Sequence, residues 1–548
     1  MTEAADLAVP ASSGPRPVSP GDIPPNAGRA IRARFTQFGA NYRWFLLLTM
    51  LMGSMATMLA ATTVNVALPA MIGAFGLGQD QAQWMSTAFL ASSTLAMLAN
   101  AWAMATYGPR ATYIFGMATF IIGSLLGAVS TTLEMLIVAR ALQGVSAGLL
   151  QPMSMFLIFQ TFPDRLRGTA MGLFSIGVVL APAFGPALGG IAVDLASWRL
   201  VFVATLPLAI IALAIAPFLM PNGERQSHER KPPLDWQGLC LLAVALVGLL
   251  SAFAGGNRDG WDSDTTFIKI AVALAAGVVF YFWERRHPFP ALNPAIFRYR
   301  QFWSAGLIIV ATGTAIYGST YLIPLFVQIV QGYSPTAAGV MMIPAGLAMV
   351  VGFPIAGRLT DRMDPRWLLT FGILCFAISG FLLSGVTALT PYWVLVSWIM
   401  LSRVGIAFCN PPANTTAVRA VPLHLLAPAT GGVSFLMQVG GAFGVNLLAV
   451  LLQRRTIFHG DHLAAEMTES NPQFLYQHAM QSQALEASGM PPLTAFTSSF
   501  EAIGGQIAMQ ATILAFRDCF FVIAVWFVII LSAIAFMPKP QLQMAQSR

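Results

Sequence analysis

Long apolar stretches alternate with short polar segments over most of the chain. A transmembrane helix needs about 20 apolar residues to cross the hydrocarbon layer, whereas the strands of an outer-membrane barrel alternate over only about ten. The pattern therefore predicts an all-α polytopic membrane protein. The expected spans are residues 44–69, 82–105, 111–130, 133–157, 168–192, 199–220, 236–255, 266–283, 302–331, 335–357, 366–387, 391–414, 427–452 and 517–537.

These spans give about fourteen helices, arranged as six, two and six. The N-terminus at 1–43 is rich in Pro, Ala, Ser and Gly, lacks the features of a signal peptide and is expected to be disordered. The expected divisions that follow are an N-terminal six-helix bundle at 44–220, a linker with two extra helices at 221–300, a C-terminal six-helix bundle at 301–537 and a tail at 538–548.

Charge predicts the orientation. Only 9% of the residues are charged and 56% are hydrophobic, whereas soluble domains carry about a quarter charged residues. Lysine and arginine gather in every second loop, and short cytoplasmic loops hold such an excess, so both termini are expected in the cytoplasm of a bacterial inner membrane. The net charge of +7 therefore indicates topology and attraction to anionic lipid, and we do not interpret it as nucleic-acid binding.

Metal, redox and enzymatic chemistry find little support. The four cysteines fall inside predicted spans without a CxxC or metal-ligand spacing, and the six histidines fall in predicted loops. The pair in "HGDH" at 459–462 is interpreted as solvated rather than metal-binding. A membrane-embedded enzyme would need His, Asp, Glu or Cys clustered at one depth, so no enzyme activity, metal or cofactor is expected.

One connection outside the membrane, residues 454–516, is long. Its first part is polar, and the rest has the pattern of a broken helix. Long loops between packed helices are uncommon unless they dock a partner or cap a pathway, although a partly ordered surface loop is the alternative.

The fourth span contains "ARALQGVSAG", which places Arg140 well inside an apolar stretch. An intramembrane Arg costs at least about 2.5 to 3.5 kcal/mol on insertion scales, so it must face protein or water and find partners. Gln143 lies one turn further along the same face. Arg140 is either a functional residue or a buried Arg that carbonyls hold to fix helix packing.

The fifth span, "GVVLAPAFGPALGG", is crowded with glycine and proline. Small residues let another helix approach closely, and proline weakens the regular hydrogen bonding. The spacing of the whole set is the specific signal. The set is Gly177, Pro182, Gly185, Pro186, Gly189 and Gly190.

These two motifs, together with "TVNVALPAMIGAF" at 63–75, resemble the major facilitator superfamily and its fourteen-span drug:proton antiporter branch, the EmrB/QacA-like exporters. The resemblance covers nearly the whole chain. It implies a role in proton coupling for Arg140, and it implies that the glycines and prolines of the fifth span form the antiporter motif that separates exporters from importers.

The superfamily's gating motif is present in two degenerate copies. "GRLTDRMDPR" keeps the motif residues Gly357, Asp361, Arg362 and Arg366. "AWAMATYGPR" keeps only Gly108 and Arg110, with Ala105 in the acidic position, which implies a weakened lock in the N-terminal half.

The first span lacks an expected acid. The family's first helix carries an Asp five residues before the Asn of its motif, and counting back from Asn65 gives Ala60. Three explanations stay open. Asp194 or Glu134 lies deeper than predicted and titrates beside the pathway; Arg140 and Arg403 bind an anionic substrate whose charge does the coupling; or transport is not proton-driven.

A cavity without an acid lacks a counter-charge for a cationic drug, so a neutral or anionic lipophile is the expected substrate. The polar and aromatic candidates for its binding are Asn65, Trp84, Asn100, Gln143, Tyr317, Tyr321, Gln328, Arg403, Asn410, Asn414 and Gln438. Tyr317 and Tyr321 are spaced to share one helix face, or to anchor an interface.

The leading hypothesis is an inner-membrane efflux transporter that works by alternating access, coupled to proton influx. The long loop resembles that of Gram-negative relatives that join a periplasmic adaptor and an outer-membrane channel, which implies a tripartite pump. The alternatives are a facilitator without proton coupling and a non-transporting sensor or assembly subunit.

Overall fold

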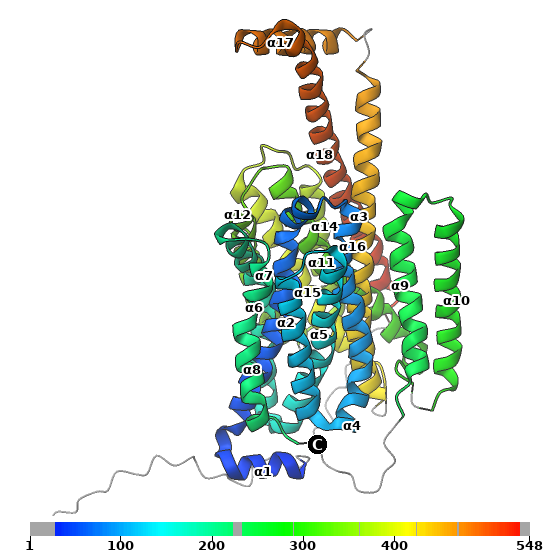
Figure 1. Ribbon diagram of the computed structural model, residues 1–548. Helices are drawn as coiled ribbons and strands as arrows, with labels where there is room; N and C mark the ends of the chain where they lie inside the picture. Colours follow the sequence, from blue (N-terminus) through cyan, green and yellow to red (C-terminus); the bar gives the residue numbers. More distant parts are fainter. Residues whose placement is uncertain are drawn as a thin grey trace, which may run out of the picture.

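A computed structural model of the chain describes residues 28–222, 233–288, 290–360, 362–422, 425–467 and 471–537, and within these ranges it contains helices and no strand (Figure 1). Two long helices, α16 and α18, project beyond one face of the helical body, which we call the extension face. The short helix α1 lies at the opposite face, which we call the terminal face. The predicted all-α membrane fold is confirmed.

The described part of the N-terminal half contains nine helical segments, one of which is a short 3-10 helix. They are α1 (Arg29–Phe38), η1 (Gly39–Asn41), α2 (Tyr42–Phe75), α3 (Gln79–Ala82), α4 (Trp84–Ala128), α5 (Leu133–Thr161), α6 (Asp164–Leu195), α7 (Leu200–Val203) and α8 (Leu206–Leu219).

The remaining helices form the linker and the C-terminal half. The linker pair is α9 (Trp236–Asp259) and α10 (Asp264–Arg286), followed by η2 (Pro294–Arg298). The C-terminal half consists of α11 (Arg300–Ile329), α12 (Pro335–Val340), α13 (Met342–Thr360), α14 (Pro365–Leu383), α15 (Tyr392–Arg419), α16 (Leu426–Ala465), α17 (Pro472–Ala487) and α18 (Pro492–Ala535).

Helix α4 contains two membrane crossings joined without a loop. Gly108 has φ 84°, which only glycine adopts without strain, and Pro109 follows it, so the chain reverses there although hydrogen bonding continues on both sides. Length and hydropathy mark twelve helices in the described ranges as candidate spans. Counting α4 as two crossings and adding the 32-residue α6 brings the total to the predicted fourteen.

The segment after residue 452 differs from the prediction. Helix α16 continues to Ala465 and α18 begins at Pro492, so much of the expected loop is a helical extension with α17 across its tip (Figure 1). His459 and His462 therefore lie in α16 and His478 in α17, where loops were expected. The apolar part of each sequence ends where the helix leaves the membrane. No proline interrupts α16 or α18 at that point, so the hydrogen-bonded backbone of each helix continues into the polar region.

The two bundles meet toward the extension face. Gln328 Nε2 donates to the carbonyl of Val66 at 3.1 Å, and Asn446 Nδ2 donates to Thr87 Oγ1 at 2.6 Å. Nearer the middle of the membrane, Gln438 Nε2 donates to Ser93 Oγ at 2.8 Å. Each bond joins a helix of one bundle to a helix of the other.

At the same face, α6 of the first bundle contacts α12 of the second through backbone. A Cβ on Gly190 would lie 2.1 Å from the Pro335 carbonyl oxygen, and a Cβ on Gly339 would lie 2.1 Å from that of Pro186. Thr336 N donates to Asp194 Oδ2 at 2.9 Å beside this contact. The contact between α6 and α12, together with the hydrogen bonds from Gln328, Asn446 and Gln438, closes the extension face.

Substitution of Gly190 by Val is expected to force α6 and α12 apart and open this face. Ala338, fully buried behind the contact, provides the reporter as Ala338→Cys in a chain whose four native cysteines are serine. A membrane-impermeant thiol reagent should label it several-fold faster in Gly190→Val. The matched control is Gly73→Val, because Gly73 is exposed and a Cβ there meets nothing within 4 Å. Equal labelling in the two variants would show that the glycine contact does not hold the face closed.

Candidate transport site

Arg140 of α5 lies at the centre of the N-terminal bundle, with 1% of its surface exposed. Its Nε donates to the Met85 carbonyl at 3.0 Å, and its Nη1 donates to the Ala60 carbonyl at 2.9 Å and to Gln143 Oε1 at 2.9 Å. The guanidinium lies 4.5 Å from the centroid of the Phe89 ring. One side chain thus joins α2, α4 and α5.

The partner of Arg140 at Ala60 is a carbonyl, at the position where the resemblance leads one to expect a carboxylate. In the described part of the chain, no carboxylate lies within 4 Å of Arg140. The hydrogen bonds satisfy donors of the guanidinium, but they do not neutralise its charge. A buried cation without an anionic partner attracts an anion.

Gln143 fixes this arrangement and does not face an open space. Its Oε1 accepts the bond from Arg140, and its Nε2 donates to Ser124 Oγ at 2.9 Å. One residue further, a Cβ on Gly144 would lie 2.3 Å from the Phe89 carbonyl oxygen, so only glycine lets α4 and α5 approach this closely. In this structure Gln143 positions Arg140.

The C-terminal bundle holds a second buried Arg on its own fourth helix. Arg403 of α15 is 6% exposed, and its Nη2 donates to Thr320 Oγ1 of α11 at 3.2 Å. It too has no carboxylate within 4 Å in the ranges described. Arg140 and Arg403 occupy equivalent helices of the two halves, and both carry an uncompensated charge.

The other predicted substrate residues fall into separate groups. Asn414 Nδ2 donates to Asn410 Oδ1 at 2.6 Å, and Asn410 Nδ2 lies 3.8 Å from Met437 Sδ. The two asparagines therefore form a hydrogen-bonded pair one turn apart on α15. Gln328 and Gln438 hold the bundles together, as described above. Asn65 accepts from Ser86 Oγ at 3.1 Å within the N-terminal bundle.

Three aromatic candidates and one amide lie apart from those groups. Tyr317 is half-buried against Gly441, and Tyr321 is fully buried in the C-terminal half of α11. Trp84 is half-buried at the first turn of α4. The Oδ1 of Asn100 is buried without a hydrogen-bond partner.

The glycines of the antiporter motif lie on two faces of α6. Gly177, Gly185 and Gly189 face α2, where a Cβ would lie 2.1 Å from Leu51 Cδ1, 2.0 Å from Thr62 Oγ1 and 2.6 Å from the Thr63 carbonyl oxygen, respectively. Gly190 and the carbonyl of Pro186 face the opposite bundle. Pro182 lies within α6. Helix α6 therefore packs tightly against its own bundle and against the contact that closes the extension face.

The two gating copies make the same contact in each half. Arg110 Nε donates to the carbonyl of Met220, which caps α8, at 3.1 Å. Arg366 Nη2 donates to the carbonyl of Met537, just beyond α18. Each bond ties the third helix of a bundle to the end of its sixth.

The rest of the second copy is less engaged. A Cβ on Gly357 meets nothing within 4 Å, and Arg362 is exposed. Asp361 lies outside the described residues.

The two acids expected near the pathway lie at helix ends. Glu134 is exposed in the first turn of α5, and Asp194 is exposed near the end of α6, where it accepts from Thr336. The suggestion that either lies deeper than its position in the sequence indicates is therefore wrong. Asp194 contacts the opposite bundle instead.

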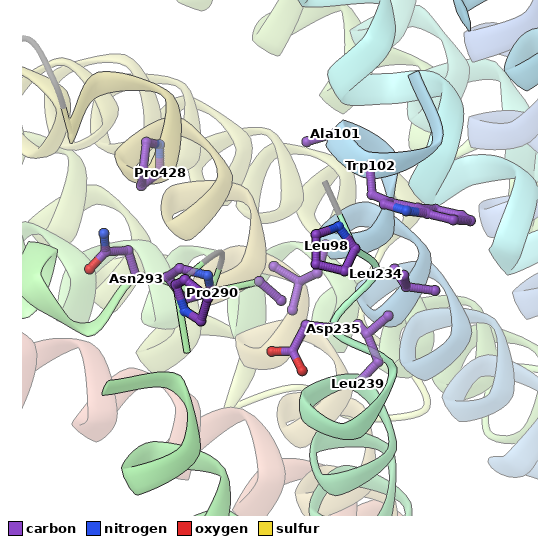
Figure 2. A pocket seen from close by; sticks show the side chains of 12 residues that line it. Leu98, Ala101, Trp102, Leu234, Asp235, Leu239, Pro290, Asn293 and Pro428 are labelled. Carbon is purple, nitrogen blue, oxygen red and sulfur yellow. The ribbon is translucent and has the colours of Figure 1, made fainter. Parts of the chain in front are cut away.

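The structure adds residues that the sequence analysis missed. Asn446 was hidden in an apolar span, although a lone amide there is itself a signal, and it bonds the two bundles. Asp235 and Glu284 lie at helix ends, where acids are ordinarily exposed, yet they are only 5% and 2% exposed. Asp235 lines a cleft of about 330 Å³ formed by residues of α4, α9, the connection before η2 and α16 (Figure 2).

The architecture defines a class of protein. Two six-helix bundles with buried polar side chains at their interface, closed on one face, form a membrane transporter. Comparison with known families supports this class: the Major Facilitator Superfamily profile matches residues 50–445 of the chain. The chain belongs to the Major Facilitator Superfamily.

The relatives and structural neighbours extend over most of the chain. It is 29% identical over 504 residues to the multidrug export protein EmrB of Haemophilus influenzae, covering 90% of this chain and 96% of that protein. It is 26% identical over 477 residues to an uncharacterised transporter, YhcA, of Bacillus subtilis, covering 87% and 89%. A peptide transporter POT, solved in complex with sulfate, has the same fold with a TM-score of 0.59 and 15% identity, covering 94% and 98%.

Substitution of Arg140 by Lys keeps the charge but removes the planar fork that reaches Ala60, Met85 and Gln143. Hydrogen bonds to a charged group are worth about 1.5 to 3 kcal/mol each. We expect Arg140→Lys to lower the thermal midpoint of the purified protein and to reduce its transport rate tenfold or more. Arg29→Lys, at an exposed position on α1, should change neither quantity. Unchanged transport in Arg140→Lys would show that charge alone suffices.

Proposed function

We propose that this chain exports lipophilic or amphiphilic compounds across the bacterial inner membrane by alternating access, driven by proton influx. Its similarity to multidrug exporters, including EmrB, supports export. We further propose that the preferred substrates are neutral or anionic. The single observation that carries this choice is the charge of Arg140, which is buried among carbonyls and an amide and has no carboxylate beside it among the residues that the structure describes.

The chemistry of the site supports the substrate class. A cationic drug would need an acid in the pathway, but the expected position holds Ala60, whose carbonyl already accepts a bond from Arg140. An anion would gain Coulomb attraction to Arg140 and Arg403, and this attraction is stronger in the poorly screened interior than in water. In this proposal, charge selection follows from two buried cations.

The contacts at the extension face support alternating access. The bonds from Gln328, Asn446 and Gln438 cross between rigid bundles and hold one face closed. Three hydrogen bonds, each worth about 0.5 to 1.5 kcal/mol net, form a barrier that substrate binding or protonation can overcome. Rocking of the bundles would break these bonds and open that face.

We also propose that the extension face is periplasmic and that the extension docks an adaptor that leads to an outer-membrane channel. Large apolar side chains are exposed along it, among them Ile457, Leu475, Tyr476, Met480, Leu493 and Phe496. Exposed apolar side chains on a projection outside the membrane cost free energy unless a partner covers them. A helical partner would fit their arrangement on α16, α17 and α18.

A facilitator without proton coupling is the second candidate, and Ala60 at the expected acid position favours it. Proteoliposomes with an internal pH-sensitive dye distinguish the two, using neutral, anionic and cationic lipophiles. We expect proton movement with the neutral and anionic compounds. Transport without any proton movement would support the facilitator and contradict the antiporter.

Docking at the extension predicts a difference between cells and vesicles. Tyr476→Ser with Leu493→Ser should reduce export from whole cells several-fold, because the adaptor loses its contact, and should leave transport in proteoliposomes unchanged, because the membrane bundles are intact. The control is Gln483→Ser, at an exposed polar position on the same helix α17. An equal loss in vesicles, or no loss in cells, would contradict the docking role.

A further inference from the structure

The base of the linker helices holds two buried carboxyl groups that face each other. Asp235 caps α9, and Glu284 lies near the end of α10. The Oδ1 of Asp235 accepts from Gly238 N and from Trp283 Nε1, both at 2.9 Å, and the Oε2 of Glu284 accepts from Leu292 N at 3.3 Å. One oxygen of each acid is therefore engaged by donors of fixed position.

The second oxygen of each acid has no donor. Asp235 Oδ2 and Glu284 Oε1 are both buried without a hydrogen-bond partner. They border the same point, since a Cβ on Gly238 would lie 2.4 Å from Oδ2 and 2.8 Å from Oε1. Two ionised carboxylates at such a site would repel each other, and one oxygen of each would lack solvation.

A proton resolves this conflict. Placed on Glu284 Oε1, it removes one negative charge and lets that oxygen donate to Asp235 Oδ2, so that both orphan oxygens gain a partner. We propose that Asp235 and Glu284 form a proton-binding site in which the two carboxyl groups share one proton, and that this site supplies the acid missing at Ala60.

The pair borders a cleft and has one described cation within 4 Å, His287. Asp235 lines the cleft of Figure 2, whose other walls are Leu, Ala, Trp, Pro and Asn side chains from α4, α9, the connection before η2 and α16. Among the described cations nearby, His287 Nδ1 lies 3.8 Å from Asp235 Oδ2. Arg285 lies over the Tyr281 ring at 5.8 Å, and Arg286 is exposed, so both are directed elsewhere.

The position of the site connects protonation to movement. Helix α9 packs against α4 of the first bundle and α16 of the second, and it pairs with α10. Loss of the proton would place two negative charges between α9 and α10 and loosen the base of the pair, which borders both bundles. The coupling part of this inference rests on the proposed proton-driven export, whereas proton binding itself does not.

Infrared difference spectroscopy of the full chain in lipid tests proton binding directly. A protonated carboxyl group has a C=O band distinct from that of a carboxylate, and ordinary Asp and Glu lose theirs above about pH 5. We expect a band that persists to higher pH in the native chain and is absent from Glu284→Gln, whose amide mimics the protonated acid and preserves the fold. The matched control is Asp264→Asn, at an exposed position at the other end of α10, which should keep the band.

Absence of the band in the native chain, or its persistence in Glu284→Gln, would overturn the site. Loss of the band when sodium replaces potassium in the buffer would also overturn it, because a metal cation would then occupy the site. Substrate-driven proton movement separates this test from that of the proposed function. If the band is present but no proton movement accompanies transport, the proton-binding site is supported and proton-coupled export is refuted. If protons move but the band is absent, proton-coupled export is supported and the proton-binding site is refuted.

Discussion

The organisation of this protein depends on one constraint, the burial of an arginine in the membrane interior with no acid beside it in the described part of the chain. Three acceptors on α2, α4 and α5 surround the Arg140 guanidinium. Leaving any of its donors without a partner in this medium would cost several kcal/mol, so the three helices are held in one register. The small residues follow from the same constraint, because Gly144 brings α4 close enough for its carbonyls and ring to enclose the cation.

The two halves share the same pattern of arginine contacts. Arg403 repeats the buried cation in the second bundle, and Arg110 and Arg366 tie corresponding helices to the carbonyls of Met220 and Met537. Two rigid bodies built alike and joined by a limited set of bonds are suited to rocking as units. The linker helices add a component outside this repeat, since α9 contacts both bundles and its base contains the buried acid pair.

The sequence was sufficient to predict most of the fold. Apolar runs located every crossing, because a membrane helix must satisfy its own backbone hydrogen bonds and be long enough to span the bilayer. The extension was harder to predict, because helices α16 and α18 continue beyond the apolar region that defines a span. The reversal at Gly108 was expected as a loop, and only the backbone geometry shows that helical bonding continues on each side of it.

The candidate site was less predictable than the fold. Arg140 contacts Gln143, and the α6 glycines pack closely against neighbouring helices, as the spacing suggested. The carbonyl of Ala60 as a partner of Arg140 has no signal in the sequence. The pairing of Asp235 with Glu284 joins residues far apart along the chain, and each alone reads as an ordinary helix-end acid. Burial and the direction of a side chain decide such roles, and both arise from tertiary packing.

The central claim, that two buried arginines select against cations, is tested most directly with a pair of ions that differ in charge alone. Tetraphenylborate and tetraphenylphosphonium share size, shape and apolar surface. Equilibrium binding of each to the purified chain in lipid, with protein-free bilayer subtracted, isolates the effect of charge. The account predicts at least tenfold tighter binding of the anion and loss of that preference in Arg140→Gln. Tighter binding of the cation by the native chain would contradict it.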